Sequence, residues 1–148
     1  MPSVFMGSKV VSPVQSLCLT LPAYNEAGVI GTLILDAQRV FRESKVVWSI
    51  IVIDDGSTDE TASIIREMSC SIPELSLVSH GVNMGLGRAI RSCLGAGLSA
   101  RPSFVGSESH FILCMDADLT HPPDTIPRMC EKADTGCDLV IASRYRPG

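Results

Sequence analysis

The chain has 148 residues, of which 45% are hydrophobic and 19% are charged, as is typical of one globular domain with a sizeable core. Its net charge is −4 and no Lys/Arg cluster interleaves with aromatic residues, which argues against a nucleic-acid-binding protein. No apolar run approaches the ~20 residues of a membrane span, and residues 1–15 lack the long apolar core of a signal peptide.

Hydrophobic periodicity predicts strands and helices that alternate along the chain. In chain order we expect a strand at 17–21, a helix at 26–41, a strand at 46–53, a helix at 57–69, a strand at 75–79, a helix rich in small residues that ends near 100, a strand at 111–115, a helix at 123–133 and a strand at 138–142. The second helix is expected to begin with a capping box, because Glu60 follows Ser57 after three residues. Residues 1–15 are expected to form a flexible arm, and 16–148 one domain.

Six cysteines lie mostly within apolar periodic segments and show no CxxC spacing. This pattern predicts buried free thiols rather than disulfides or a zinc site. Free thiols are typical of a reducing compartment, so we expect a cytosolic chain.

Strands that alternate with helices predict an α/β fold with a mainly parallel sheet and helices on both faces. In such a sheet the ends of the first, second and fourth strands lie at one edge, where ligands bind. Three polar segments follow these strands: residues 22–26, 54–57 and 116–118. We therefore expect a functional site at this edge.

Asp116 and Asp118 are the most informative residues of the three segments. Two carboxylates held close together repel each other, so a shared cation stabilises them. Mg²⁺ or Mn²⁺ commonly joins one or two protein carboxylates to the phosphates of a substrate. The alternative is structural, with Asp118 capping the helix that starts near Pro122 and Asp116 in solvent.

Five motifs in order resemble those of the family 2 glycosyltransferases of the GT-A fold, and most closely the dolichol-phosphate or polyprenyl-phosphate mannosyltransferases. These motifs are Pro22-Ala23-Tyr24-Asn25-Glu26, Ile53-Asp54-Asp55-Gly56-Ser57, Gly85-Leu86-Gly87-Arg88-Ala89, Asp116-Ala117-Asp118 with His121-Pro122-Pro123, and Ser143-Arg144-Tyr145. The resemblance covers residues 16–148. It implies a three-layer, Rossmann-like nucleotide-sugar-binding domain whose fold continues beyond Gly148.

The resemblance also implies roles for individual residues. The donor nucleotide-sugar would be bound by Pro22, Tyr24, Glu26, Ile53, Asp55, Asp116, Ala117, Asp118 and Arg144. A Mg²⁺ or Mn²⁺ ion would be held by Asp116 and Asp118, with Thr120 at a place where relatives often have Gln. Asp118 and Arg144 would act in catalysis by stabilising the leaving diphosphate.

Several of these residues also have structural interpretations. Asp54 or Asp55 can cap the following helix, and Glu26 can simply favour a helix N-terminus. The glycines around Leu86 can serve tight helix packing or allow a phosphate to approach backbone N–H groups. His121 is expected to shape a turn rather than to act as an acid or base.

The activity implied is transfer of mannose from GDP-mannose to a dolichyl or polyprenyl phosphate, with inversion at the anomeric carbon. An acceptor of this kind is already an anion at pH 7 and needs no strong base. Three alternatives are a transferase using UDP-glucose or UDP-GlcNAc and a glycan acceptor, a truncated donor-binding module without turnover, and a receiver-like domain that binds Mg²⁺ near Asp54.

A lipid acceptor implies work at the cytosolic face of a membrane. The sequence shows no segment by which the chain reaches a membrane on its own. We therefore expect a membrane-anchoring subunit or a further C-terminal segment to supply that contact.

Overall fold

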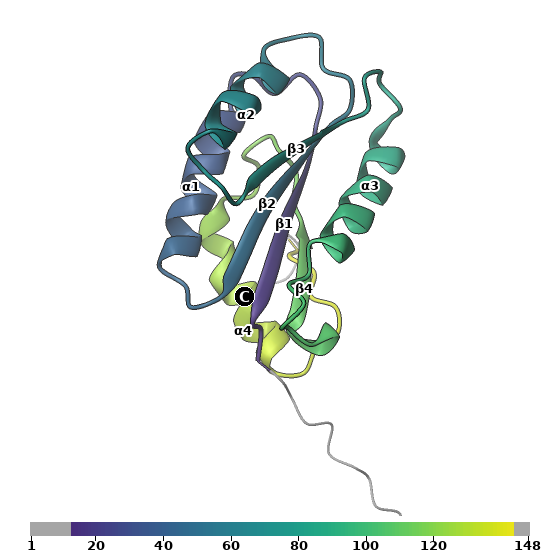
Figure 1. Ribbon diagram of the computed structural model, residues 1–148. Helices are drawn as coiled ribbons and strands as arrows, with labels where there is room; N and C mark the ends of the chain where they lie inside the picture. Colours follow the sequence, from purple (N-terminus) through teal and green to yellow (C-terminus); the bar gives the residue numbers. More distant parts are fainter. Residues whose placement is uncertain (1–12, 144–148) are drawn as a thin grey trace, which may run out of the picture.

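The apolar runs predicted as strands form one parallel sheet in the computed structural model, which describes residues 13–143 (Figure 1). Its strands lie in the order β3-β2-β1-β4 and all neighbours are parallel. They are β1 (Ser16–Ala23), β2 (Val47–Asp54), β3 (Leu75–Ser79) and β4 (His110–Cys114). The prediction that the first, second and fourth strands end at one edge is confirmed.

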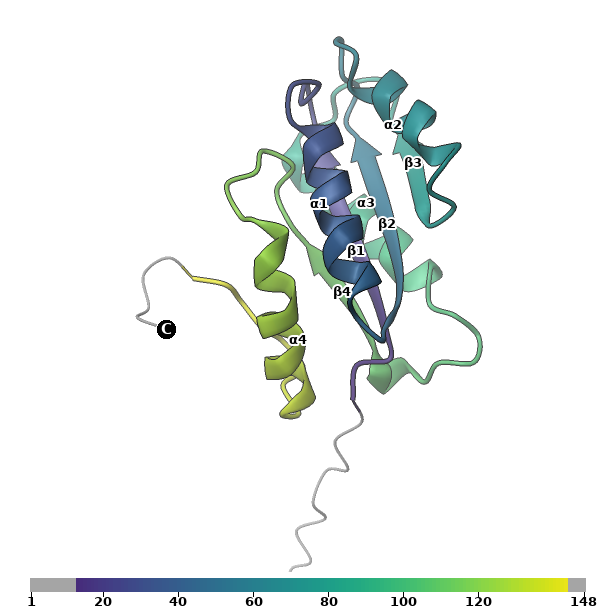
Figure 2. The same cartoon turned by 90° about the vertical axis from the view of Figure 1, so that its left-hand side faces the viewer.

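Helices cover both faces of the sheet, as expected for a parallel sheet. They are α1 (Ile30–Arg42), α2 (Thr61–Ser69), α3 (Leu86–Ser99) and α4 (Ile126–Asp134), with short 3₁₀ turns at Ser107–Ser109 (η1) and Pro123–Thr125 (η2). Figures 1 and 2 show α1, α2 and α4 on one face and α3 on the other. The predicted three-layer α/β architecture is therefore confirmed.

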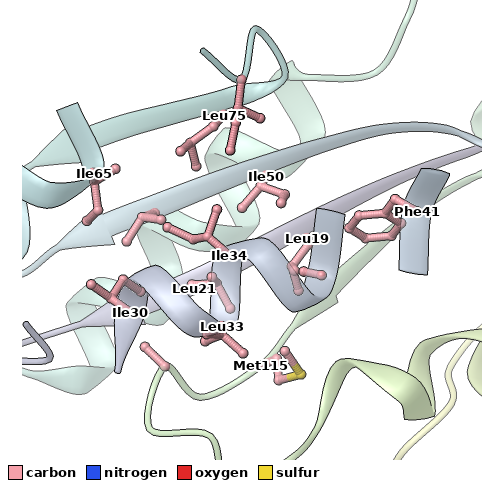
Figure 3. Packing of buried hydrophobic residues seen from close by; sticks show 14 of the residues in the cluster. Leu19, Leu21, Ile30, Leu33, Ile34, Phe41, Ile50, Ile65, Leu75 and Met115 are labelled. Carbon is pink, nitrogen blue, oxygen red and sulfur yellow. The ribbon is translucent and has the colours of Figure 1, made fainter. Parts of the chain in front are cut away.

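The larger core lies between the sheet and α1, α2 and α4 (Figure 3). Leu19 and Leu21 of β1 point into it because alternate residues of a strand share a face. Leu33 and Ile34 of α1 meet them and are fully buried. Phe41 stacks on Trp48 with ring centroids 5.2 Å apart, which anchors the end of α1 to the start of β2.

The core beneath α3 is built from small side chains. Ala89 and Cys93 of α3 pack against Cys18 of β1 and Ile53 of β2. A Cβ on Gly97 would lie 2.7 Å from the side chain of Ile112, so glycine is needed for the close approach of α3 to the sheet.

The predicted strand at 138–142 is wrong. The segment has no strand geometry, and Leu139 and Ile141 are largely exposed. A strand exists only where its backbone pairs with a neighbour, and no strand within residues 13–143 pairs with this segment. Leu139 and Val140 instead line a hollow of about 80 Å³ together with residues of β4 and α4.

Two helix starts also differ from the prediction. α1 begins at Ile30 rather than Glu26, and a turn precedes it in which the N–H groups of Val29 and Ile30 both donate to the Glu26 carbonyl. The capping box at α2 does not form: Ser57 Oγ accepts the N–H of Asn25, and the Glu60 carboxylate bonds Ser63 Oγ. The start of α2 is instead supported by Asp59, whose carboxylate accepts the N–H of Thr61 at 3.0 Å.

All six cysteines are free thiols, as predicted. The prediction that they are buried holds for Cys18 and Cys93, whereas Cys70, Cys114 and Cys137 are exposed. In the described part of the chain, none of the helices is both long enough and apolar enough to cross a membrane.

Candidate functional site

A cavity of about 390 Å³ lies at the carboxyl edge of the sheet, where the sequence predicted a site. It is lined by Pro22, Ala23, Tyr24, Glu26, Asp55, Asn83, Gly85, Leu86, Ala89, Asp116, Ala117 and Asp118. The three predicted acidic residues of β2 and β4 therefore share one hollow. Seven of the residues predicted to bind the donor line it.

The loops after β1 and β2 are held together by hydrogen bonds between side chains and backbone. Asn25 adopts the left-handed conformation with φ 56°, and its Oδ1 accepts the N–H of Thr58 at 2.8 Å. The next N–H, from Glu26, is donated to Thr61 Oγ1 at 2.8 Å. These bonds fix the backbone that carries Tyr24 and Glu26 at the cavity wall.

Asp54 and Asp55 have different roles at the end of β2. Asp54 is buried and accepts the N–H of Ser57 and the hydroxyl of Ser79, both at 3.0 Å, so it shapes the loop. Gly56 follows with φ 73°, and a Cβ there would lie 2.3 Å from the carbonyl carbon of Val82. Glycine is therefore needed where two loops pass each other beside the cavity.

Asp55 is the centre of a hydrogen-bond network that sequence reasoning missed. His80 Nδ1 lies 2.7 Å from one carboxylate oxygen, and the N–H groups of Met84 and Gly85 donate to the carboxylate at 3.0 and 2.8 Å. His80 Nε2 lies 2.8 Å from Ser92 Oγ on α3. Burial works to raise the pKa of Asp55, but these hydrogen bonds outweigh it and hold the pKa below its usual range.

The network explains why the loop between β3 and α3 lines the cavity. Two backbone N–H groups of this loop donate hydrogen bonds to the Asp55 carboxylate. Gly85 itself has φ 89° at the start of α3. Asp55 therefore positions the segment 83–86, whose side chains and backbone form part of the wall. In this structure Asp55 acts first as a structural acceptor that faces the cavity.

Asp116 and Asp118 project from the end of β4 on either side of buried Ala117. The N–H of Thr120 donates to Asp118 Oδ1 at 2.9 Å, and its hydroxyl also bonds this carboxylate. These bonds hold the pKa of Asp118 below its usual range. Burial, followed by the charges of Asp118 and Asp59, raises the pKa of Glu26, which lines the same cavity.

The carboxylates of this cavity suit a divalent ion whose remaining ligands come from a substrate. Asp116 and Asp118 offer exposed, hard carboxylate oxygens in one cavity, which suits Mg²⁺ or Mn²⁺. Within residues 13–143, no three His, Cys, Asp or Glu side chains are placed to hold a metal ion together. Diphosphate oxygens and waters would therefore supply the other ligands.

Two predicted site residues are not at the cavity wall, and a third cannot be placed relative to it because it lies outside the described residues. Ile53 is fully buried and packs against Ala89, so it is not among the residues that line the cavity, although it was predicted to bind the donor. Thr120 contacts Asp118 rather than the cavity. Arg144 lies outside the described residues.

The remaining cavity residues, and the histidine that contacts Asp55 from outside the cavity, had little or no signal in the sequence. Asn83 and His80 carried no sign of function in the sequence, because a lone polar residue after a strand is ordinary in a loop. Leu86 belongs to the glycine-containing motif 85–89, whose structural and ligand-binding interpretations were both open. Ala89 packs on the sheet, as the structural interpretation expects, and it lines the cavity together with Gly85 and Leu86.

Comparison with known proteins identifies the family of the chain. The family model described as glycosyl transferase family 2 matches residues 18–148. A polyprenol monophosphomannose synthase of Mycolicibacterium smegmatis is 34% identical over 139 residues, which cover 93% of this chain and 48% of that protein. An undecaprenyl-phosphate 4-deoxy-4-formamido-L-arabinose transferase of Pectobacterium carotovorum is 30% identical over 131 residues, 88% of this chain and 37% of that protein.

Solved structures share the fold. The glucosyl-3-phosphoglycerate synthase of Mycobacterium tuberculosis in complex with UDP has a TM-score of 0.58 and 25% identity over 82% of this chain and 41% of its own. A mannosyltransferase from Pyrobaculum calidifontis in complex with GDP-Man and Mn²⁺ has a TM-score of 0.52 and 24% identity, with coverages of 69% and 27%. The chain spans less than half the length of these curated relatives and solved neighbours. On the family match and the shared GT-A architecture, the chain belongs to glycosyl transferase family 2.

Proposed function

We propose that this chain is the donor-binding part of a glycosyltransferase that moves a sugar from a nucleotide-sugar to a polyprenyl or dolichyl phosphate. The observation that carries the proposal is the cavity that Asp116 and Asp118, after β4, share with Tyr24 and Glu26, after β1. Carboxylates suited to a metal diphosphate are then in one cavity with an aromatic ring and a hydrogen-bond acceptor suited to a nucleoside. The relatives named for polyprenyl phosphates support this acceptor class.

The cavity residues divide the work of binding and orientation. Asp116 and Asp118 would hold Mg²⁺ or Mn²⁺, which supplies positive charge opposite the leaving diphosphate. Ala117 is small and buried between them, so the chain can approach the donor closely at this point. Tyr24 is 45% exposed and can present its ring and hydroxyl to the nucleoside, and Glu26 can accept hydrogen bonds from ribose hydroxyls.

The reaction is a single inverting displacement. A phosphate oxygen of the lipid forms a bond to the anomeric carbon, while the bond from that carbon to the diphosphate oxygen breaks and its electron pair leaves with the nucleoside diphosphate. The attacking phosphate is an anion, so this step needs no general base. Arg144 is proposed to stabilise the charge of the leaving group.

Mannose from GDP-mannose is the favoured donor, since relatives named for mannose transfer include one in complex with GDP-Man and Mn²⁺. A UDP-sugar such as UDP-glucose or UDP-GlcNAc is the alternative, supported by the neighbour in complex with UDP. A glycan is the alternative to a prenyl-phosphate acceptor, and donor binding without turnover is the alternative to catalysis. The reaction is proposed to occur at the cytosolic face of a membrane, because the acceptor is a lipid, with an anchoring subunit or further C-terminal segment assisting.

The test is a panel of GDP- and UDP-sugars measured by calorimetry with and without Mn²⁺, followed by turnover with polyprenyl phosphate or saccharide acceptors. We expect GDP-mannose to bind only with the metal and GDP to be released only with prenyl phosphate. Preferential binding of a UDP-sugar would identify that compound as the donor. Release of the nucleotide with saccharides would identify a glycan as the acceptor. Binding without release would identify a donor-binding module, and failure of every nucleotide to bind would contradict the proposal.

A further inference from the structure

The outer side of α3 carries a row of large apolar side chains that is exposed in the described structure. The members of this outer row are Leu86, Ile90, Leu94 and Leu98, which are 62%, 38%, 48% and 68% exposed. Residues four apart lie on the same side of a helix, so the row is continuous. The part of α3 that packs on the sheet, through Ala89, Cys93 and Gly97, lies next to this row on the helix surface. Figure 1 shows α3 standing alone on its face of the sheet.

The exposed apolar residues of the chain are concentrated around this helix. Seven of the 13 large apolar side chains that are exposed within the described residues lie between Val82 and Phe104. Apolar residues scattered singly over a surface are ordinary. A concentration on one helix and its two flanking loops instead marks an interaction surface.

The charge of this region is opposite to that of the rest of the chain. Residues 75–107 contain Arg88, Arg91 and Arg101 and no Asp or Glu, although the chain as a whole carries −4. Arg91 lies three residues from Leu94, and residues three apart are neighbours on a helix. Beyond its Leu86 end, which adjoins the acidic cavity, the apolar row is therefore bordered by these arginines, which favours an anionic partner.

The outer row is continuous with the candidate active site. Leu86 is the first residue of the row and also lines the cavity that holds Asp116 and Asp118. From there the row runs along α3 to Leu98, roughly 18 Å away at the rise of an α-helix. The polar cavity and the apolar row thus match the order of phosphate head and hydrocarbon in a lipid phosphate.

We propose that α3 docks the chain onto an anionic lipid surface, with the outer row and Phe104 at the level of the acyl chains and Arg88 and Arg91 among the headgroup phosphates. An apolar face bordered by Arg is typical of a helix that lies in a membrane interface. The proposal deepens the proposed function and rests on it for the identity of the acceptor. It also revises the expectation from the sequence that the chain has no means of its own to reach a membrane.

The test is flotation of the 148-residue protein with vesicles of phosphatidylcholine alone or mixed with phosphatidylglycerol. We expect binding to the anionic vesicles that weakens as salt is added. Leu94→Glu and Leu98→Glu should each weaken binding by about tenfold or more. Arg91→Gln should weaken it roughly fivefold, because one basic residue near an anionic surface contributes about this much.

Leu35→Glu is the matched control. Leu35 is 55% exposed, like Leu94 and Leu98, but it lies on α1 at the opposite face of the sheet. It should leave vesicle binding unchanged, and circular dichroism should show that every variant is folded. Equal loss with Leu35→Glu, or no binding of the wild type to anionic vesicles, would overturn the proposal. So would a dimer that Leu94→Glu dissociates, because the row would then contact a second copy.

Donor binding separates this inference from the proposed function. None of the substituted residues lines the cavity, so calorimetry with GDP, UDP and Mn²⁺ should give the same result for all variants. Vesicle binding without nucleotide binding would support docking and contradict the transferase. Nucleotide binding without vesicle binding would support the transferase and contradict docking.

Discussion

The imidazole of His80 lies 2.7 Å from the carboxylate of Asp55, and this contact joins the end of β3 to the end of β2. Through Asp55 it also positions the N–H groups of Met84 and Gly85, which precede α3. A histidine outside the cavity therefore controls the shape of one cavity wall.

His80→Ala should weaken nucleotide binding as well as fold stability. The substitution removes one partner of a buried carboxylate, which costs about 1–3 kcal/mol, and releases the loop that contains Asn83. His110→Ala is the control, because His110 also makes two hydrogen bonds, to Ser16 Oγ and the Gly97 carbonyl, but far along β4 from the cavity. Thermal unfolding should show losses for both, whereas calorimetry should show weaker nucleotide binding for His80→Ala alone. Equal binding by both variants would contradict the positioning role.

The stability supplied by Asp55 should depend on pH. Because its pKa is lowered in the folded chain, the folded state binds fewer protons than the unfolded state near pH 4. The stabilisation is then fully present above the unfolded carboxyl pKa of about 3.9 and is lost as the pH falls through the lower folded value. Thermal unfolding of wild type and Asp55→Asn should therefore differ most above pH 5 and converge on acidification. A constant difference across this range would contradict the ionised role of Asp55.

Asp116→Asn and Asp118→Asn should each reduce metal-dependent nucleotide binding by about tenfold or more, since each removes one anionic oxygen ligand of a hard cation. Glu131→Gln is the control, because Glu131 is an exposed carboxylate of α4 that does not line the cavity. Calorimetry with GDP or UDP should show that Mn²⁺ strengthens binding to wild type and to Glu131→Gln but not to the two Asp variants. Undiminished Mn²⁺ dependence in Asp116→Asn and Asp118→Asn would contradict the metal role.

The edge of the sheet could be predicted from the sequence because parallel strands fix which ends meet. β3 has the predicted bounds, and Asp55, Asp116 and Asp118 share the cavity that their places after strands implied. The segment 138–142 was mispredicted because alternation of apolar residues does not show whether a partner strand is present. His80 was missed because its role depends on Asp55, which lies 25 residues away in sequence.

α3 shows a different limit of sequence reasoning. The helix has two apolar sides, a row of large residues beginning at Leu86 and a row of small ones beginning at Ala89. Hydrophobicity alone would bury the larger row, yet the smaller row faces the sheet. The choice depends on how closely helix and sheet approach, which the side chain of Ile112 beside Gly97 determines.

Gly56→Ala should destabilise the fold more than Gly81→Ala. Both glycines have positive φ, 73° and 75°, so both substitutions carry the cost of a left-handed residue, of order 1–2 kcal/mol. Only at Gly56 would the new Cβ also meet backbone, 2.3 Å from the carbonyl carbon of Val82, whereas nothing lies within 4 Å at Gly81. Denaturant unfolding should show the larger loss for Gly56→Ala, and equal losses would contradict the close passage of the two loops.

Two glycines of α3 provide the sharpest test of how this helix packs. Gly95→Ala should stabilise the fold by about 1 kcal/mol, because Ala is the better helix former and nothing lies within 4 Å of the new Cβ. Gly97→Ala gains the same helix propensity, but its new Cβ would lie 2.7 Å from the side chain of Ile112. Overpacking of this kind lowers the free energy of unfolding by about 1–3 kcal/mol, which should exceed the gain. In an Ile112→Ala background the loss caused by Gly97→Ala should shrink, since that change removes the three Ile112 side-chain atoms that the new Cβ would meet. Denaturant unfolding measures all three, and stabilisation by Gly97→Ala equal to that by Gly95→Ala would show that α3 does not approach the sheet as closely as the structure places it.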